Sequence, residues 1–337
     1  MKKFLLFTIG YMISANAALA QLDLPRLPNL NLAPVLSLKL DPPTPLPNSS
    51  IAITAGLSGI ANVNNSTYTW FLNGKKEAEA SGLNKNDFAF TAGAIGSIYQ
   101  VRVAIITPTG DNLSDSINLT VSDVDLTWDA NTEAPLNYYG KLLPTKGSFV
   151  TVSALPLIYR PGTKSLINST DLVYNWKLND KFDSQKSGVD KSIYNFRTTD
   201  FAGGAHRVRL EIRAADGAAS LDKSVLIPIV APQTLVYLSD AKTNLPYGGA
   251  LKNLTTGPMS LNFIAKNYFF NKPADQLKWQ WMIDNKEISG GGDQPWLATF
   301  NIPSNINRPF FTQIQVAAKN PVNEPETSQS TINLEVR

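Results

Sequence analysis

The chain has 337 residues, of which 30 are Lys or Arg, 27 are Asp or Glu and none is Cys. Without cysteine it can form no disulfide, no thiolate metal site and no cysteine nucleophile. The formal net charge is only +3 and the basic residues are scattered singly, so the composition argues against nucleic acid as a partner and against a polybasic membrane patch.

The first twenty residues have the pattern of a secretory signal peptide. Lys2 and Lys3 give a positive start, residues 4–13 are an apolar stretch, and Ala18-Leu19-Ala20 is a small-x-small cleavage site, with a competing site at residues 15–17. The apolar stretch is too short to span a membrane. We therefore expect an exported protein, extracellular or associated with the cell surface, with no transmembrane anchor after cleavage.

Residues 21–34 form a proline-rich leader that contains Pro25, Pro28 and Pro34. Proline fixes φ and removes a backbone donor, which predicts an extended segment rather than a packed element. Such a leader can act as a docking segment for a partner. The simpler interpretation, which we prefer, is a spacer that lifts the first domain away from a surface.

From residue 35 onward, short runs that alternate apolar and polar residues are separated by turn residues at roughly ten-residue spacing. With no helical period of useful length, this pattern predicts an all-β chain of antiparallel β-sandwiches. We expect three tandem Ig-like domains, over residues 35–122, 123–231 and 232–337. The linkers between them are only two or three residues long, which favours a semi-rigid rod.

A tryptophan motif marks the repeat. Residues 67–75, around Trp70, have counterparts around Trp176 and Trp281, which lie 106 and then 105 residues further along the chain. Ig-like sandwiches bury a tryptophan on the third strand and, about thirty residues later, place a tyrosine two residues before a cysteine. Tyr99 and His206 hold that tyrosine position in the first two domains, and the third domain lacks the feature. We predict a structural core role for all five residues.

Each repeat resembles bacterial Ig-like and PKD-like domains, through Tyr-x-Trp-x-x-Asn-Gly-Lys and the later Ser81-Gly82 and Ser187-Gly188 turns. The whole chain resembles the secreted tandem Ig-like proteins of candidate-phyla (Parcubacteria-type) bacteria. The segments that carry this likeness are residues 124–130, 139–141, 172–176 and 246–251. The Trp-Asp-Phe-Gly-Asp-Gly run typical of PKD domains is absent. The resemblance implies a surface or envelope protein and supplies no catalytic residue.

Few residues offer chemistry. His206 is the only histidine, and a structural role suits its place in a strand better than a catalytic one. Asp123, Asp125 and Asp129 lie near the first domain junction, where they could hold a calcium ion, although a solvated strand edge is the simpler interpretation. A carboxylate-dependent hydrolase is a remote alternative that needs two acids about 5 to 9 Å apart in a cleft. We predict no catalytic residue, metal site or cofactor.

Exposed aromatic residues are the candidate interaction surface. Tyr138 and Tyr139 lie in the 134–140 loop and Tyr247 in the 244–249 loop, at similar places after the expected first strands of domains two and three; Trp296 is a further aromatic residue of this set. They could dock a protein or stack on a sugar, although packing between neighbouring domains is the simpler interpretation. We predict a non-enzymatic structural or adhesive protein whose partners are other envelope or appendage proteins. The alternative is an array of carbohydrate-binding modules that uses these aromatics for glycans.

Overall fold

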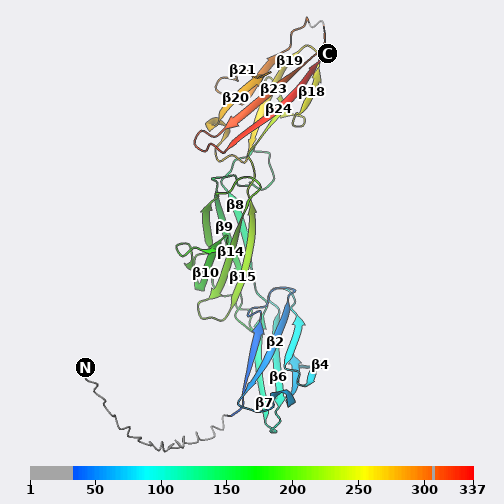
Figure 1. Ribbon diagram of the computed structural model, residues 1–337, viewed down its shortest axis with the longest axis vertical. Helices are drawn as coiled ribbons and strands as arrows, with labels where there is room; N and C mark the ends of the chain where they lie inside the picture. Colours follow the sequence, from blue (N-terminus) through cyan, green and yellow to red (C-terminus); the bar gives the residue numbers. More distant parts are fainter. Residues whose placement is uncertain (1–32, 306–307) are drawn as a thin grey trace, which may run out of the picture.

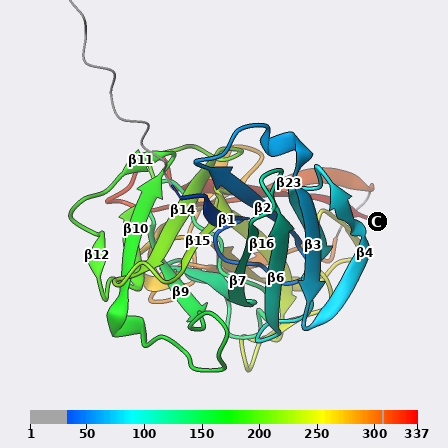
Figure 2. The ribbon, with the colours of Figure 1, turned by 90° about the horizontal axis from the view of Figure 1, so that it is seen from below.

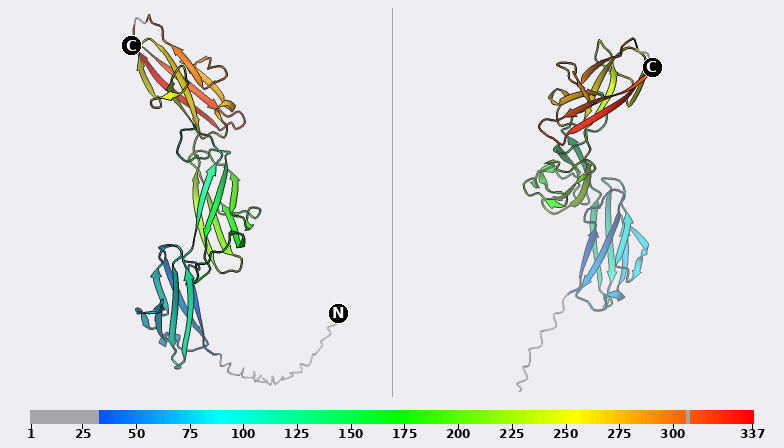
Figure 3. Two further views of the ribbon diagram at one scale, coloured as in Figure 1. Left: turned by 180° about the vertical axis from the view of Figure 1, so that it is seen from behind. Right: turned by 45° about the horizontal axis from the view of Figure 1, so that its top comes forward.

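The computed structural model describes residues 33–305 and 308–337, and confirms the predicted all-β class: three β-sandwiches follow one another along the chain (Figure 1). The predicted signal peptide, and the predicted leader apart from residues 33–34, lie outside these ranges. The sandwiches form a rod, and Figure 3 shows the same end-to-end order from two further directions. Seen along the rod, the first two sandwiches are offset sideways from each other (Figure 2).

The first sandwich encloses Trp70 between a sheet of order β1-β2-β5 and a sheet of order β4-β3-β6-β7. One 3₁₀ turn, η1, precedes β3. Its elements are β1 (Val35–Asp41), β2 (Ser50–Ser58), η1 (Val63–Asn65), β3 (Thr67–Leu72), β4 (Lys75–Leu83), β5 (Asp87–Thr91), β6 (Ile98–Ile106) and β7 (Asn112–Thr120).

The second sandwich repeats this plan around Trp176, with sheets of order β13-β9-β8 and β11-β10-β14-β15, and with β12 also paired to β10. Its elements are β8 (Asp123–Ala130), β9 (Phe149–Leu157), η2 (Ser169–Asp171), β10 (Leu172–Leu178), β11 (Lys181–Phe182), β12 (Gly188–Val189), β13 (Ile193–Arg197), β14 (Ala205–Ala214) and β15 (Ser220–Pro228).

The third sandwich encloses Trp281 between sheets of order β17-β16-β19-β22 and β18-β24-β23-β20-β21. All strand pairs of the described chain are antiparallel except β18 with β24, which is parallel. Its elements are β16 (Gln233–Ser239), β17 (Pro246–Tyr247), β18 (Asn253–Thr256), β19 (Ser260–Tyr268), η3 (Ala274–Gln276), β20 (Lys278–Ile283), β21 (Lys286–Ile288), β22 (Leu297–Asn301), β23 (Phe310–Lys319) and β24 (Thr327–Val336).

The hairpin after each motif tryptophan explains why the motif recurs. Asn73, Asn179 and Asp284 have φ values of 50°, 49° and 45°, and the residue after each also has positive φ, as a two-residue hairpin turn of type I′ requires. The side-chain oxygen of each accepts a backbone hydrogen bond of 2.9 Å from the neighbouring long strand. The Asn or Asp of the motif therefore forms the turn and ties it to β6, β14 or β23.

The three tryptophans are fully enclosed, with at most 1% of each residue exposed. Their indole Nε1 atoms donate to backbone carbonyls of Lys85, Lys191 and Pro295 at 2.9, 2.7 and 3.0 Å. Trp70 stacks on Phe88 and Trp176 on Tyr194, with ring centroids 5.6 and 5.4 Å apart. Each ring thus joins the two sheets of its sandwich through packing and one satisfied polar atom.

The position at which Ig-like domains have the tyrosine is occupied by a different residue, with a different hydrogen bond, in each of the three domains. The hydroxyl of Tyr99 accepts a hydrogen bond from the backbone N–H of Gly93 at 2.8 Å. His206, only 1% exposed, accepts one at Nε2 from the N–H of Thr199 at 3.3 Å. In the third domain Thr312 holds the position, and its hydroxyl donates to Asp284 at 2.8 Å. Tyr99 and His206 thus each bind the backbone of the loop that precedes their own strand, whereas Thr312 binds the hairpin turn.

Two core tyrosines make the second sandwich sensitive to alkali. Burial, with a smaller contribution from Asp190, raises the pKa of Tyr174 to about 12. Burial and the nearby carboxylate of Asp183 do the same for Tyr194, whose pKa is also about 12. The unfolded value is about 10, so the stabilisation is complete below pH 10 and is lost as the pH rises towards 12.

We expect the melting temperature of the second domain to fall steeply between pH 10 and 12, which calorimetry would measure. The double variant Tyr174→Phe, Tyr194→Phe removes both titrating groups and should flatten this dependence. An unchanged slope in that variant would show that other groups cause the alkaline loss.

Candidate functional site

The joint between the first two sandwiches is closed by hydroxyl groups. Thr120 Oγ1 donates to the carbonyl of Thr163 at 3.0 Å and accepts from its N–H at 3.1 Å. The buried Ser122 Oγ accepts from the N–H of Tyr159 at 3.0 Å. Gly162, at φ +73°, faces Asn118 so closely that a Cβ would lie 2.6 Å from the Asn118 Cβ. These contacts hold the two domains at close range.

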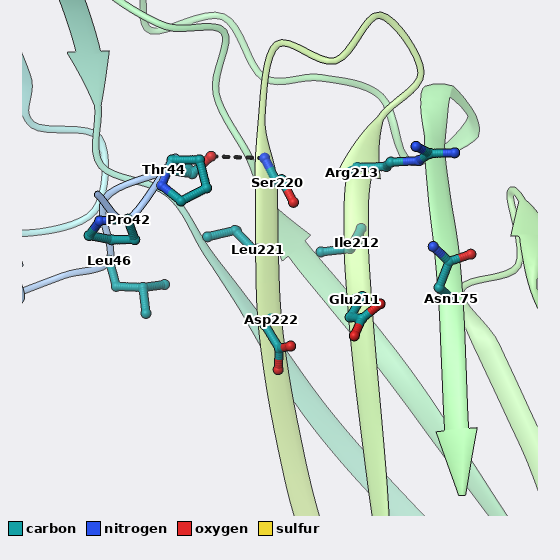
Figure 4. A pocket seen from close by; sticks show the side chains of 11 residues that line it. Pro42, Thr44, Leu46, Asn175, Glu211, Ile212, Arg213, Ser220, Leu221 and Asp222 are labelled. Atoms are coloured by element: carbon teal, nitrogen blue, oxygen red, sulfur yellow. Dashed lines mark hydrogen bonds between the residues drawn. The ribbon is translucent and has the colours of Figure 1, made fainter. Parts of the chain in front are cut away.

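A hollow of about 470 Å³ lies beside this joint (Figure 4). One wall is the β1–β2 loop, at the left of Figure 4, from which Thr44 Oγ1 accepts a hydrogen bond from the N–H of Ser220 at 2.9 Å and Leu46 packs on the second core. The carboxylates of Glu211 and Asp222 line it, and both already form ion pairs, with Lys177 and Arg209 respectively. Both carboxylates of this hollow are therefore already paired within the chain, and we regard the hollow as part of the joint.

The joint between the second and third sandwiches is built around Glu326, whose residue surface is only 1% exposed. Its Oε1 accepts from Thr145 Oγ1 at 2.6 Å and from the backbone N–H of Asn271 at 3.0 Å, and its Oε2 accepts from the amide of Asn320. A buried carboxylate is tolerated when its oxygens are satisfied by donors in this way. Because these donors come from both domains, the network joins them.

Two further contacts extend this joint. Glu133 and the 269–270 segment exchange backbone hydrogen bonds, from Glu133 N to Phe270 O and from Phe269 N to Glu133 O, both at 2.7 Å. Asn323 Nδ2 donates to the carbonyl of Lys146 at 2.8 Å. The loop after β8 is thereby tied to the end of β19.

A groove of about 580 Å³ opens at this second joint, and we take it as the candidate functional site. One wall is the 133–137 loop of the second domain, and the other comprises the turn before β17, the start of η3 and Trp296 of the third domain. Its floor is the end of β19, at Ala265, Lys266 and Asn267. Open apolar walls with a few polar groups are typical of binding sites.

Lys266 is the cation of this groove. It is half-buried, and burial lowers the pKa of its ammonium group. Among the described residues no carboxylate lies within ion-pair distance of it, although Glu133 lines the opposite wall and is exposed. A desolvated ammonium without an internal partner gains more from an incoming anion than a lysine in open water does.

The predicted interaction residues divide between this groove and the loops beside it. Trp296 lines the groove but also packs on the third core, so it is only partly exposed. Tyr138 is half-buried and packs edge-on against Tyr268 and Phe269 at 5.8 and 5.7 Å, which makes it a domain contact. Tyr139 is 96% exposed and Tyr247 is 55% exposed.

The acidic residues predicted as an alternative calcium site lie along β8. The carboxylate of Asp123 pairs with Lys223 at 3.1 Å and accepts from the N–H of Val124 at 2.8 Å, while Asp125 and Asp129 are exposed. The described part of the chain holds no group of three His, Cys, Asp or Glu residues placed to bind a metal ion. A cation at this joint would have to displace the lysine.

Sequence reasoning missed Lys266, Asn267 and Glu326. Lys266 lies on the outward face of β19, so its place in the alternation of residues 261–266 would have indicated an accessible cation. Glu326 had no local signal. Within the described ranges, no helix is long and apolar enough to cross a membrane.

Comparisons with known proteins show a general likeness of fold. No protein-family model matches the chain, and no curated protein matches it. Among solved structures, the three N-terminal domains of the bacteriophage RB49 highly immunogenic outer capsid protein are 11% identical, with 90% of this chain and 99% of that chain covered and a TM-score of 0.27.

Two further arrays are equally distant. The central fibronectin-III array of RIM-binding protein is 11% identical, with 91% of this chain and 98% of that chain covered and a TM-score of 0.29. The insect immune protein hemolin is 13% identical, with 90% and 76% covered and a TM-score of 0.24. Likeness at this level concerns the tandem β-sandwich fold and transfers no property of those proteins to this chain.

Proposed function

We propose that this protein is a non-enzymatic, exported structural or adhesive rod of the cell envelope or of a surface appendage, which holds a partner at the groove between its second and third sandwiches. The observation that carries the proposal is the buried network around Glu326. It ties the two domains together through Asn271, which lies in the chain between the groove residues Asn267 and Pro273, so we expect both walls of the groove to keep their relative positions.

The signal-like first twenty residues and the proline-rich leader support export and separation from a surface. The resemblance to secreted tandem Ig-like proteins of candidate-phyla bacteria points the same way. Other envelope or appendage proteins are the partners that such a rod would meet.

Fractionation of the producing cells, with N-terminal sequencing of the recovered protein, tests this proposal. We expect the mature protein to begin near Gln21 and to cross-link to envelope components on intact cells. Recovery solely as an uncleaved cytoplasmic protein, or as a free monomer in the medium with no cross-linked envelope partner, would contradict it.

A carbohydrate-binding array is the second candidate, favoured by the almost complete exposure of Tyr139 and by the place of Trp296 in the groove. Aromatic rings at such positions can stack on sugar rings. Glycan-array binding that is lost in Tyr139→Ala or Trp296→Ala would support it, and absence of glycan binding by the intact protein would remove it.

A further inference from the structure

The floor of the groove contains a short open section of strand edge. β19 pairs with β16 on one side along residues 263–268, and with β22 on the other side only along residues 260–264. β22 begins at Leu297, opposite Ile264. Beyond that point the described chain meets this end of β19 only through Trp296, which bonds Ala265, and through Glu133, which forms an isolated bridge with Phe270.

The direction of the backbone groups at this edge follows from the neighbouring bonds. Alternate residues of an antiparallel strand direct their N–H and C=O groups to the same side. Ala265 N donates to Trp296 O at 2.8 Å, on the side of β22 and away from β16. Asn267, two residues further along β19, therefore directs its N–H and C=O to this same side, which is the side of the groove.

Asn267 lies at the bottom of the groove and is only 8% exposed. Within the described residues, neither a strand nor a side chain supplies a partner for its backbone N–H and C=O on that side. Buried backbone groups are almost always paired, and an unpaired donor and acceptor cost free energy comparable to a lost hydrogen bond. An incoming ligand that satisfies both groups recovers this cost.

The adjacent side chains define what else the ligand must carry. Lys266 offers a half-buried ammonium group with no internal anionic partner, and Pro135, Pro246 and Trp296 supply apolar walls. Glu133, on the opposite wall, is exposed, so solvent and salt screen it more than they screen Lys266. The groove thus combines main-chain hydrogen bonding, one cationic site and apolar surface.

We propose that the open edge at Asn267 binds an extended, acidic peptide segment of a partner protein. One residue of this segment exchanges two backbone hydrogen bonds with Asn267, and a neighbouring carboxylate of the segment contacts Lys266. This inference rests on the proposed role as a partner-binding rod and names the chemistry of the partner at the same groove.

The backbone geometry favours a peptide over a sugar. An extended peptide presents a donor and an acceptor at the spacing that a strand edge requires, so one of its residues can pair with Asn267 in the gap between Trp296 and Glu133, where the peptide crosses the edge. A sugar hydroxyl can replace either hydrogen bond. A glycan, however, has no regular spacing of donors and acceptors that matches both backbone groups of Asn267. An acidic glycan is therefore treated as an alternative outcome of the test.

Titration of the ¹⁵N-labelled full-length mature protein with a capped peptide of alternating valine and glutamate tests the proposal. We expect saturable shifts of the Asn267 and Lys266 amide signals. Lys266→Met should weaken binding roughly tenfold, because a hydrogen bond to a charged group is lost. The matched control Lys278→Met, on the opposite sheet of the same domain, should bind as the wild type does.

Two probe variants separate backbone pairing from charge attraction. The same peptide N-methylated at its central residue, and the same peptide with lysine replacing glutamate, should both bind much more weakly. Equal binding of the N-methylated peptide, no saturable shift at Asn267, or binding of oligogalacturonate at this site with failure of the peptide would each overturn the proposal. The envelope fractionation does not depend on this result, so a failed peptide with a surface-linked rod would leave the proposed function standing.

Discussion

Replacement of Trp176 by alanine is expected to unfold the second sandwich under conditions in which the wild-type protein is folded. The ring is fully buried, stacks on Tyr194 and donates a hydrogen bond to the carbonyl of Lys191 at 2.7 Å. Truncation of such a side chain costs about 3 to 5 kcal/mol, through lost burial and a cavity. A domain of this size has a total stability of about 5 to 15 kcal/mol.

Calorimetry of the intact chain would measure this effect as a large downward shift of one unfolding transition. Phe182→Ala is the matched control, because that aromatic residue lies on the neighbouring strand β11 and is 51% exposed. We expect little change in the control. If Trp176→Ala kept the wild-type melting behaviour, the motif would have to be regarded as a binding element instead of a core element.

Replacement of Glu326 by alanine is expected to loosen the joint between the second and third sandwiches. The change leaves the hydroxyl of Thr145, the N–H of Asn271 and the amide of Asn320 without their acceptors in a buried site. Each unsatisfied group costs about 1 to 3 kcal/mol unless water enters. Water entry would itself separate the domains.

Hydrogen exchange at the Asn271 amide measures this loosening most directly. We expect exchange to accelerate roughly ten- to a hundredfold, the factor that corresponds to one such lost bond. Glu324→Ala is the matched control, because Glu324 is two residues away in the chain and its side chain is 86% exposed. This variant should leave the exchange rate of the Asn271 amide unchanged. Equal protection of Asn271 in the wild type and in Glu326→Ala would show that the carboxylate does not hold the joint.

The parts of the fold that depend on local chemistry could be read from the sequence. Hairpin turns with Asn73 or Asn179 need residues that accept positive φ, and the alternation around each motif tryptophan places its ring inside the sandwich. These signals lie within a few residues of each other. The fold class and the spacing of the repeats follow from them.

The joints and the groove could not be read in the same way. Thr145 and Glu326 are 181 residues apart, and nothing near either residue marks their contact. The open edge at Asn267 depends on where β22 begins, and hence on the turn before Trp296. Strand ends are poorly determined by alternation because the last pairs of a ladder are set by tertiary contacts.

The third sandwich contains both a feature that the sequence predicts and a feature that it does not. Its Trp281 was predicted from the motif, whereas the parallel pairing of β18 with β24 had no signal in the chain. Trp296 was predicted for an interaction surface as one of a set of aromatic residues expected to be exposed or to lie at an interface. Its partial packing on the third core depends on the path of the preceding loop, which sequence patterns do not specify.

The proposed function requires a stiff rod that keeps the walls of the second-joint groove in place. The natural chain has no cysteine, so spin labels can be attached uniquely at Lys181→Cys and Lys286→Cys, exposed and equivalent positions in the second and third sandwiches. Pulsed dipolar spectroscopy then gives the distribution of distances across the joint. The rod predicts a single narrow distribution, and a broad or multi-peaked distribution in the otherwise wild-type chain would contradict it.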